Sequence, residues 1–138
     1  MSLKHRLLRA RPIVFDDEVI EGVVLKSNTP ISPLGDIDPK TGEIIDPQSN
    51  IRGKSVSNKI LVAPYFRGST VGSYVLFALS KYGVAPKAII VGRVDPMLVA
   101  GCVIGNIPLV ELVRYEEIPS NATVLLKKTD NGVEVHVK

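Results

Sequence analysis

Cysteine and histidine are scarce in this sequence of 138 residues, and tryptophan is absent. Cys102 is the only cysteine, so neither an internal disulfide nor a cluster of metal-binding thiolates can be assembled from this chain. The two histidines lie near opposite ends, without the spacing of a metal site or a catalytic dyad. We therefore expect no metal site in this chain, and any metal cofactor has to be held elsewhere.

Aromatic residues make up only 5% of the chain. A nucleic-acid-binding domain normally combines a basic face with aromatic side chains that stack on bases. The net charge of +3 comes partly from Lys4, Arg6, Arg9 and Arg11, and elsewhere the two signs of charge are interspersed. We therefore expect no binding to nucleic acid.

Long hydrophobic runs are also missing. No segment approaches the roughly 18 apolar residues of a membrane span, and the basic start is not followed by a signal-peptide core. We expect no membrane association and a cytoplasmic location. The composition, 45% hydrophobic and 22% charged, is too apolar for a disordered chain, and the length suits one domain with one core.

Apolar, β-branched segments predict an α/β domain in which strands alternate with helices. The expected strands are residues 19–26, 59–63, 87–91 and 107–110, followed by a hairpin of 123–126 and 133–137 around an Asn-Gly turn. A short strand at residues 12–15 can precede them. We divide the chain into a basic N-terminal extension or edge strand, residues 1–18, and a domain of residues 19–138.

Two helices are expected. Residues 71–82 place apolar side chains on one helical face, namely Val71, Tyr74, Val75, Ala78, Leu79 and Tyr82. Gly83 suits the left-handed position that ends this helix. The second helix opens at Asp95 and Pro96, which suit the cap and the first turn, and we expect Gly101 and Gly105 to end it.

Residues 27–58 form a long connection rich in Pro, Gly, Asp, Ser and Asn. Connections of this length are uncommon unless they bind a ligand or pack against a partner. An ordered surface loop is the alternative interpretation, and the sequence alone does not decide between them.

Residues 67–73 leave a predicted strand and enter the first helix. Backbone N–H groups at a helix N-terminus lack helical partners, so this loop favours an anion. Gly68 allows close approach, while Ser69 and Thr70 add hydroxyl groups, although the spacing matches neither common phosphate-binding fingerprint. Ser69 or Thr70 serves equally well as a plain helix cap. No histidine lies nearby to complete a hydrolase triad.

Several segments of the sequence resemble, in their order and spacing along the chain, the small subunit of the aconitase-X-type dehydratases. They are residues 38–43, 46–47, 53–55, 60–62, 67–76, 83–86, 95–96 and 107–110, and the block Arg-Gly-Ser-Thr-Val-Gly-Ser at 67–73 is the most specific. The resemblance covers nearly the whole chain apart from the basic start. It implies a single swivelling β/β/α domain like the swivel domain of aconitases.

The resemblance also implies an activity. The family's small subunit is part of a hydro-lyase that reversibly dehydrates (R)-5-phosphomevalonate to trans-anhydromevalonate 5-phosphate, in a mevalonate route to isoprenoids. A separate large subunit holds a [4Fe-4S] cluster through its own cysteines. By this resemblance Ser69 is the proton acceptor, and Gly68, Thr70 and Arg67 contact the substrate.

The sequence departs from many relatives at two places. Tyr65 and Phe66 stand where relatives have Gly-Gly, and Gln48-Ser49-Asn50 where they have a His-Pro pair. Other hydroxy acids, such as cis-3-hydroxy-L-proline, therefore stay open as substrates. A stand-alone phosphate-binding module and a purely structural subunit are the alternatives from other classes. Arg52 and Arg93 are secondary candidates for anion binding.

Overall fold

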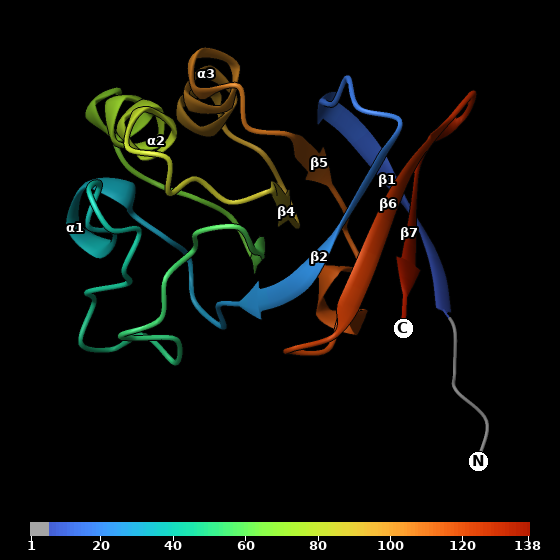
Figure 1. Cartoon of the computed structure of the whole chain (residues 1–138), viewed down its shortest axis with the longest axis horizontal. Helices are drawn as coiled ribbons and strands as arrows, with labels where there is room; N and C mark the ends of the chain where they lie inside the picture. Colours follow the sequence, from blue (N-terminus) through green and yellow to red (C-terminus); the bar gives the residue numbers. More distant parts are fainter. Residues whose placement is uncertain (1–5) are drawn as a thin grey trace.

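The computed structural model describes residues 6–138, and Lys4 of the basic stretch lies outside them. Its elements in chain order are β1 (Arg6–Val14), β2 (Val19–Lys26), α1 (Pro33–Asp36), β3 (Ile60–Ala63), α2 (Val71–Lys81), β4 (Ala88–Val91), α3 (Pro96–Gly105), β5 (Leu109–Glu111), a 3-10 turn (Tyr115–Glu117), β6 (Thr123–Thr129) and β7 (Gly132–Val137). The strands close into a barrel in the order β1-β5-β4-β3-β2-β6-β7. Figure 1 shows the helices gathered on one side of this barrel. The predicted α/β class is confirmed.

Strands β2, β3, β4 and β5 run parallel, while β1, β6 and β7 pair antiparallel and close the barrel. Strand β3 lies between β2 and β4, with one face in the barrel and the other under the helices, which explains its continuous apolar run. Ile60 and Val62 point into the barrel, whereas Leu61 and Ala63 pack under the helices. Strands that are buried on both faces need apolar residues at every position. The result is a β/β/α arrangement with two separate cores.

The basic N-terminal segment forms β1, which is longer than the strand expected at residues 12–15. It pairs with both β5 and β7, so it is an interior strand of the barrel and not an edge strand. Leu8 and Ala10 face the barrel core, and Arg9 and Arg11 alternate with them on the outside. Alternation of apolar and charged residues is the pattern of a strand with one buried and one solvent-exposed face.

Helix α2 has the predicted extent, but the predicted buried face is partly wrong. The helix ends before Tyr82, and Gly83 takes a left-handed φ of 73° as expected. Its buried side includes Gly72, Val75, Leu76 and Leu79. The opposite side is apolar and exposed, and we call it the outer face of α2: Val71, Tyr74, Phe77 and Tyr82. The predicted face had combined residues of both sides.

Helix α3 corrects the expectation that Gly101 ends it. The helix runs on to Gly105, and Asn106 at φ 54° forms the left-handed cap. Gly101 is buried against α2, where a Cβ would lie 2.5 Å from Cδ1 of Leu76. The glycine therefore allows two helices to approach closely.

Serine hydroxyls also tie the two helices together. The buried Ser73 Oγ donates to the Met97 carbonyl at 2.9 Å, and Ser80 Oγ donates to the Gly105 carbonyl at 2.5 Å. These bonds lie near the two ends of α2. They fix the register of α2 against α3, and hence the direction in which the N-termini of both helices point.

The long connection, residues 27–58, is an ordered cover over the helix-side core. It contains only the four-residue α1, but four of its isoleucines are buried: Ile31, Ile37, Ile44 and Ile51. Isolated bridges join Ile37 to Ile44 and Ile31 to Phe66. These buried isoleucines recur every six or seven residues, but the surrounding polar residues make the segment look like a surface loop in the sequence.

Glu111 at the end of β5 links β1 to the loop between β4 and α3. Its carboxylate accepts hydrogen bonds from Arg11 Nε at 3.0 Å and Nη2 at 2.8 Å, and from the Val94 N–H at 3.0 Å. Burial raises the pKa of Glu111, but the bonds from Arg11 and Val94 outweigh it and hold that pKa below its ordinary value. The charged form is therefore the one that stabilises the fold.

We expect Gly101→Val to destabilise the domain by about 1 to 3 kcal/mol, because the new side chain overpacks the contact with Leu76. Ala100→Val, on the exposed side of the same helix, is the control for introducing a valine there, and its lower helix propensity than alanine makes it the more demanding comparison. The free energy of unfolding, from urea titration, checks this. Equal stabilities of the two variants would contradict the close packing of α2 and α3.

Glu111→Gln should lower stability at pH 7, and this loss should shrink as the pH falls below about 4.5. A carboxylate with a depressed folded pKa contributes stability above its unfolded pKa, near 4.5, and loses it as the pH falls through the folded pKa. Urea unfolding of wild type and variant across this range measures the difference, with the exposed Glu43→Gln as control. A difference that does not change with pH would disprove the charge-based account.

Candidate functional site

The candidate site lies where the chain leaves the carboxyl ends of β3 and β4. Because these strands are parallel neighbours, the loops that follow them, residues 64–70 and 92–95, lie side by side. The Gly92 N–H donates to the Pro64 carbonyl at 2.9 Å and joins the two loops. The N-termini of α2 and α3 both begin here, at the edge where open α/β sheets usually bind ligands.

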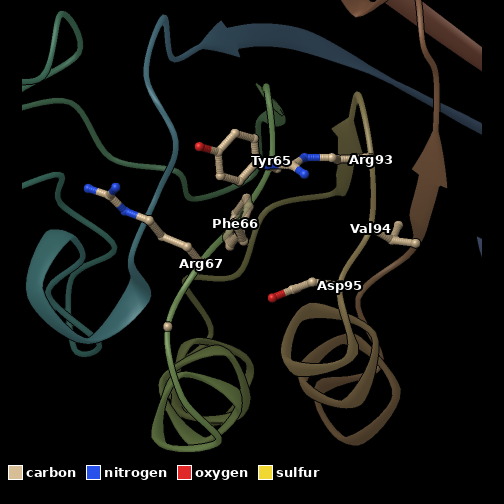
Figure 2. A pocket seen from close by; sticks show the side chains of 7 residues that line it. Tyr65, Phe66, Arg67, Arg93, Val94 and Asp95 are labelled. Atoms are coloured by element: carbon tan, nitrogen blue, oxygen red, sulfur yellow. The ribbon is translucent and has the colours of Figure 1, made fainter.

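Two shallow depressions adjoin each other between these loops. The first, about 240 Å³, is lined by residues of both loops: Tyr65, Phe66, Arg67, Gly68, Arg93, Val94 and Asp95 (Figure 2). The second, about 450 Å³, extends along α3: Gly68, Thr70, Asp95, Pro96, Met97 and Ala100. Gly68 and Asp95 line both, so the two depressions form one open cleft.

Backbone pairing holds the first loop in place. Ile31 of the long connection donates its N–H to the Tyr65 carbonyl at 3.2 Å, and the Arg67 N–H donates to the Ile31 carbonyl at 2.9 Å. Gly68 then takes φ 134°, a conformation that side-chain-bearing residues rarely adopt. Ser69 and Thr70 are thereby presented on an exposed turn at the start of α2.

The interpretation of Ser69 or Thr70 as a helix cap finds little support. Thr70 stands at the cap position with helical φ and ψ of −53° and −24°, and its side chain forms no capping bond. Ser69 Oγ accepts the Val71 N–H only at 3.4 Å, longer than an ordinary hydrogen bond. Within residues 6–138, the N–H groups of Gly68, Ser69 and Thr70 form no hydrogen bond. They are therefore free to bind an anion.

The N-terminus of α3 is different, because its own carboxylate fills it. Asp95 Oδ1 accepts the Leu98 N–H at 3.0 Å in the capping geometry that the sequence predicted. This places a negative charge on the α3 side of the cleft. An anionic ligand is therefore favoured at α2 and disfavoured at α3.

The two arginines of the cleft differ in direction. Arg67 Nε donates to Ser32 Oγ at 3.1 Å, and Figure 2 shows the Arg67 side chain running away from Asp95 and Arg93. Arg93 reaches across to the other loop, where its Cζ lies 4.0 Å from the centre of the Tyr65 ring. Both the predicted contact residue Arg67 and the secondary candidate Arg93 therefore line the cleft, with side chains that run in different directions.

A sequence signal for the pairing of Tyr65 with Arg93 did exist. Ala63 and Val91 are register partners in β3 and β4, and Tyr65 and Arg93 each follow them by two residues. Parallel strands carry equally offset residues to neighbouring positions. Arg52, the other secondary candidate, lines neither depression of the cleft.

The part of the chain that the structure describes does not fit an iron–sulfur cluster. Within residues 6–138, no group of three or more His, Cys, Asp or Glu side chains is arranged to hold a metal ion. Cys102 is buried in the helix-side core, and burial raises the pKa of its thiol to about 12. A thiol in that state is not a thiolate ligand. Among the same described residues, no helix has the length and apolar character to span a membrane.

Comparison with known proteins gives consistent matches. Residues 7–135 match the model of the aconitase X swivel domain family. The phosphomevalonate dehydratase small subunit of Pyrococcus horikoshii is 47% identical over 117 residues, which are 85% of this chain and 87% of that protein. The protein of the same name from Methanopyrus kandleri is 47% identical over 130 residues, 94% and 96% of the two chains.

The fold agrees as well. The crystal structure of Thermococcus kodakaraensis aconitase X in its holo form superposes with a TM-score of 0.88 at 40% identity, covering 96% of this chain and 98% of that chain. The expected swivelling β/β/α domain is thereby confirmed. Sequence and fold together show that this chain belongs to the aconitase X swivel domain family.

Proposed function

We propose that this chain is the small subunit of a hydro-lyase that dehydrates phosphomevalonate, and that Ser69 is its proton acceptor. The names of the 42–47% identical relatives support the substrate and the subunit role. The observation that carries the role of Ser69 is structural. Its hydroxyl lies on an exposed turn beside three unpaired N–H groups at the start of α2.

The proposed step removes a proton and a hydroxyl group from neighbouring carbons. Ser69 Oγ, as an alkoxide, takes the proton from the carbon next to the substrate carboxylate. The C–H electron pair forms the double bond, and the hydroxyl leaves from the adjacent carbon. The N–H groups of Gly68, Ser69 and Thr70 stabilise negative charge on the alkoxide and on the carboxylate oxygens during this transfer. A serine hydroxyl needs such help, since it is a weak base alone.

The other half of the chemistry belongs to a partner. We propose a larger subunit that holds a [4Fe-4S] cluster, which assists departure of the hydroxyl group when bound. The small-subunit names of the relatives support such a partner. In this division of labour, the present chain supplies the proton acceptor and part of the substrate cleft.

The outer face of α2 is the surface that we assign to this partner. It begins at Val71, directly after the Ser69 turn, and continues through Tyr74 and Phe77. Exposed apolar surface of this kind is typical of protein interfaces. A partner docked there also brings its own catalytic groups next to Ser69.

Ser69→Ala in the assembled two-subunit enzyme should lower kcat for phosphomevalonate by roughly 100-fold or more, because the proton acceptor is lost. Its stability should barely change, given the long contact of Ser69 Oγ with Val71. Ser80→Ala is the matched control, since it removes a hydroxyl from α2, which follows Ser69, at a position away from the cleft. This control should lose about 1 kcal/mol of stability and keep its activity.

Steady-state kinetics and urea unfolding of both variants provide the readout. If Ser69→Ala keeps nearly full kcat, the hydroxyl is not the proton acceptor. If the wild-type complex itself does not dehydrate phosphomevalonate, the substrate assignment is wrong.

Tyr74→Glu should weaken assembly with the large subunit at least about 10-fold, because it places a charge in an apolar interface. The domain should stay folded, as Tyr74 is 68% exposed. Leu7→Glu is the control, because it places the same charge at an exposed apolar residue on β1. Sedimentation of the mixed subunits measures the affinity. Equal assembly of both variants would exclude the outer face of α2 as the interface.

A further inference from the structure

We propose that Arg93, positioned by the ring of Tyr65, binds the phosphate group of the substrate, and that this pair selects a phosphorylated substrate. The proposal rests on the proposed function, because it takes phosphomevalonate as the ligand. It assigns the two anionic ends of that molecule to two different parts of the cleft. The carboxylate lies at the N-terminus of α2, and the phosphate lies at Arg93.

The charge of Arg93 is available for binding an anion. Among residues 6–138, no carboxylate forms an ion pair with its guanidinium, whose contact is with the face of the Tyr65 ring. A cation over an aromatic face keeps its N–H donors available at its edge. Arginine uses such donors in pairs to bind phosphate oxygens. Arg93 is therefore a cation of this cleft with free binding capacity.

The other charged groups of the cleft are less suited to hold the phosphate. Arg67 also lines the cleft, but its Nε donor is engaged with Ser32 and its side chain runs away from Arg93 and Asp95. The N-terminus of α3 already binds the carboxylate of Asp95, which repels a further anion. Arg93 is the lining cation whose contact, with the face of the Tyr65 ring, leaves its N–H donors available.

The orientation of the substrate supports the same assignment. Ser69 has to reach the proton next to the carboxylate, so the carboxylate lies beside Ser69 and its neighbouring N–H groups. The phosphate is at the opposite end of the carbon chain and has to lie further along the cleft. Arg93 belongs to the second loop, after β4, whereas Ser69 belongs to the first loop, after β3. The two anionic ends thus reach separate partners.

Tyr65 acts in this arrangement as a positioning residue. A free arginine side chain has many rotamers, and immobilising it on a ligand costs entropy. The contact of 4.0 Å with the Tyr65 ring restricts Arg93 before the substrate arrives. The loop that carries Arg93 is also held, because Glu111 accepts the N–H of its neighbour Val94. Pre-ordering of this kind improves affinity more than chemical rate.

The test compares variants in the assembled enzyme. Arg93→Met should raise KM for phosphomevalonate by roughly 10- to 100-fold and change kcat much less. Inhibition by unphosphorylated mevalonate should be unaffected, because that molecule lacks the group that Arg93 binds. Arg52→Met, an exposed arginine outside the cleft, is the matched control and should behave as wild type.

The role of Tyr65 has its own variants. Tyr65→Phe keeps the aromatic face and should leave KM unchanged, whereas Tyr65→Leu should raise KM roughly 3-fold or more. Equal KM values for Tyr65→Leu and wild type would exclude the positioning role. A purely structural role of the ring would instead lower stability without separating KM from kcat.

An Arg93→Met enzyme with unchanged KM, or with mevalonate inhibition weakened as much as phosphomevalonate affinity, would overturn the proposal. Calorimetric titration of the complexes with phosphomevalonate separates this failure from that of the proposed function. If the wild type binds the compound without dehydrating it, the proposed reaction is wrong, and loss of binding in Arg93→Met still supports the phosphate site. If the wild type neither binds nor dehydrates it, both proposals fail.

Discussion

The parallel pairing of β3 with β4 is the constraint on which the site depends. Both strands are buried on both faces, so neither can shift without moving apolar side chains out of one of the two cores. Their common register places the loops after Ala63 and Val91 side by side. The cleft, the two helix N-termini and the contact of Tyr65 with Arg93 all follow from this register. Residues far apart in sequence are thereby fixed to one edge of the sheet.

The close packing of α2 on α3 determines what the domain presents to its surroundings. Gly72 and Gly101 remove bulk from the contact, and Ser73 adds a buried hydrogen bond to it. Because this side of α2 packs against α3, the opposite side, the apolar outer face of α2, is exposed. The N-termini of the two helices also differ in charge. That of α3 is capped by its own Asp95 carboxylate, whereas that of α2 has unpaired N–H groups. A cleft with one anion-accepting end suits an anionic substrate better than a neutral one.

The elements with strong local signals were predictable. The run of apolar residues in β3 and β4, the extent of α2 and the Asp95 cap depend on local periodicity or capping, which neighbours in sequence determine. The interior position of β1 and the burial of the long connection were not, because both depend on pairing with distant strands. The exposed side of α2 was mispredicted for the same reason: the side that carries Gly72, Leu76 and Leu79 packs inward, and that choice depends on α3 and the core rather than on the helix alone.

The sequence by itself determined the family and the loop at residues 67–73, because the order of residue types around Gly68 and Ser69 is a local pattern that needs no fold to be read. It also determined the lack of cluster ligands. Only the tertiary structure decided which arginine faces the cleft, since side-chain direction depends on neighbours such as Ser32 and Tyr65. It likewise decided that the N–H groups beside Ser69 stay unpaired, because that depends on the geometry of the turn and on every group that packs around it.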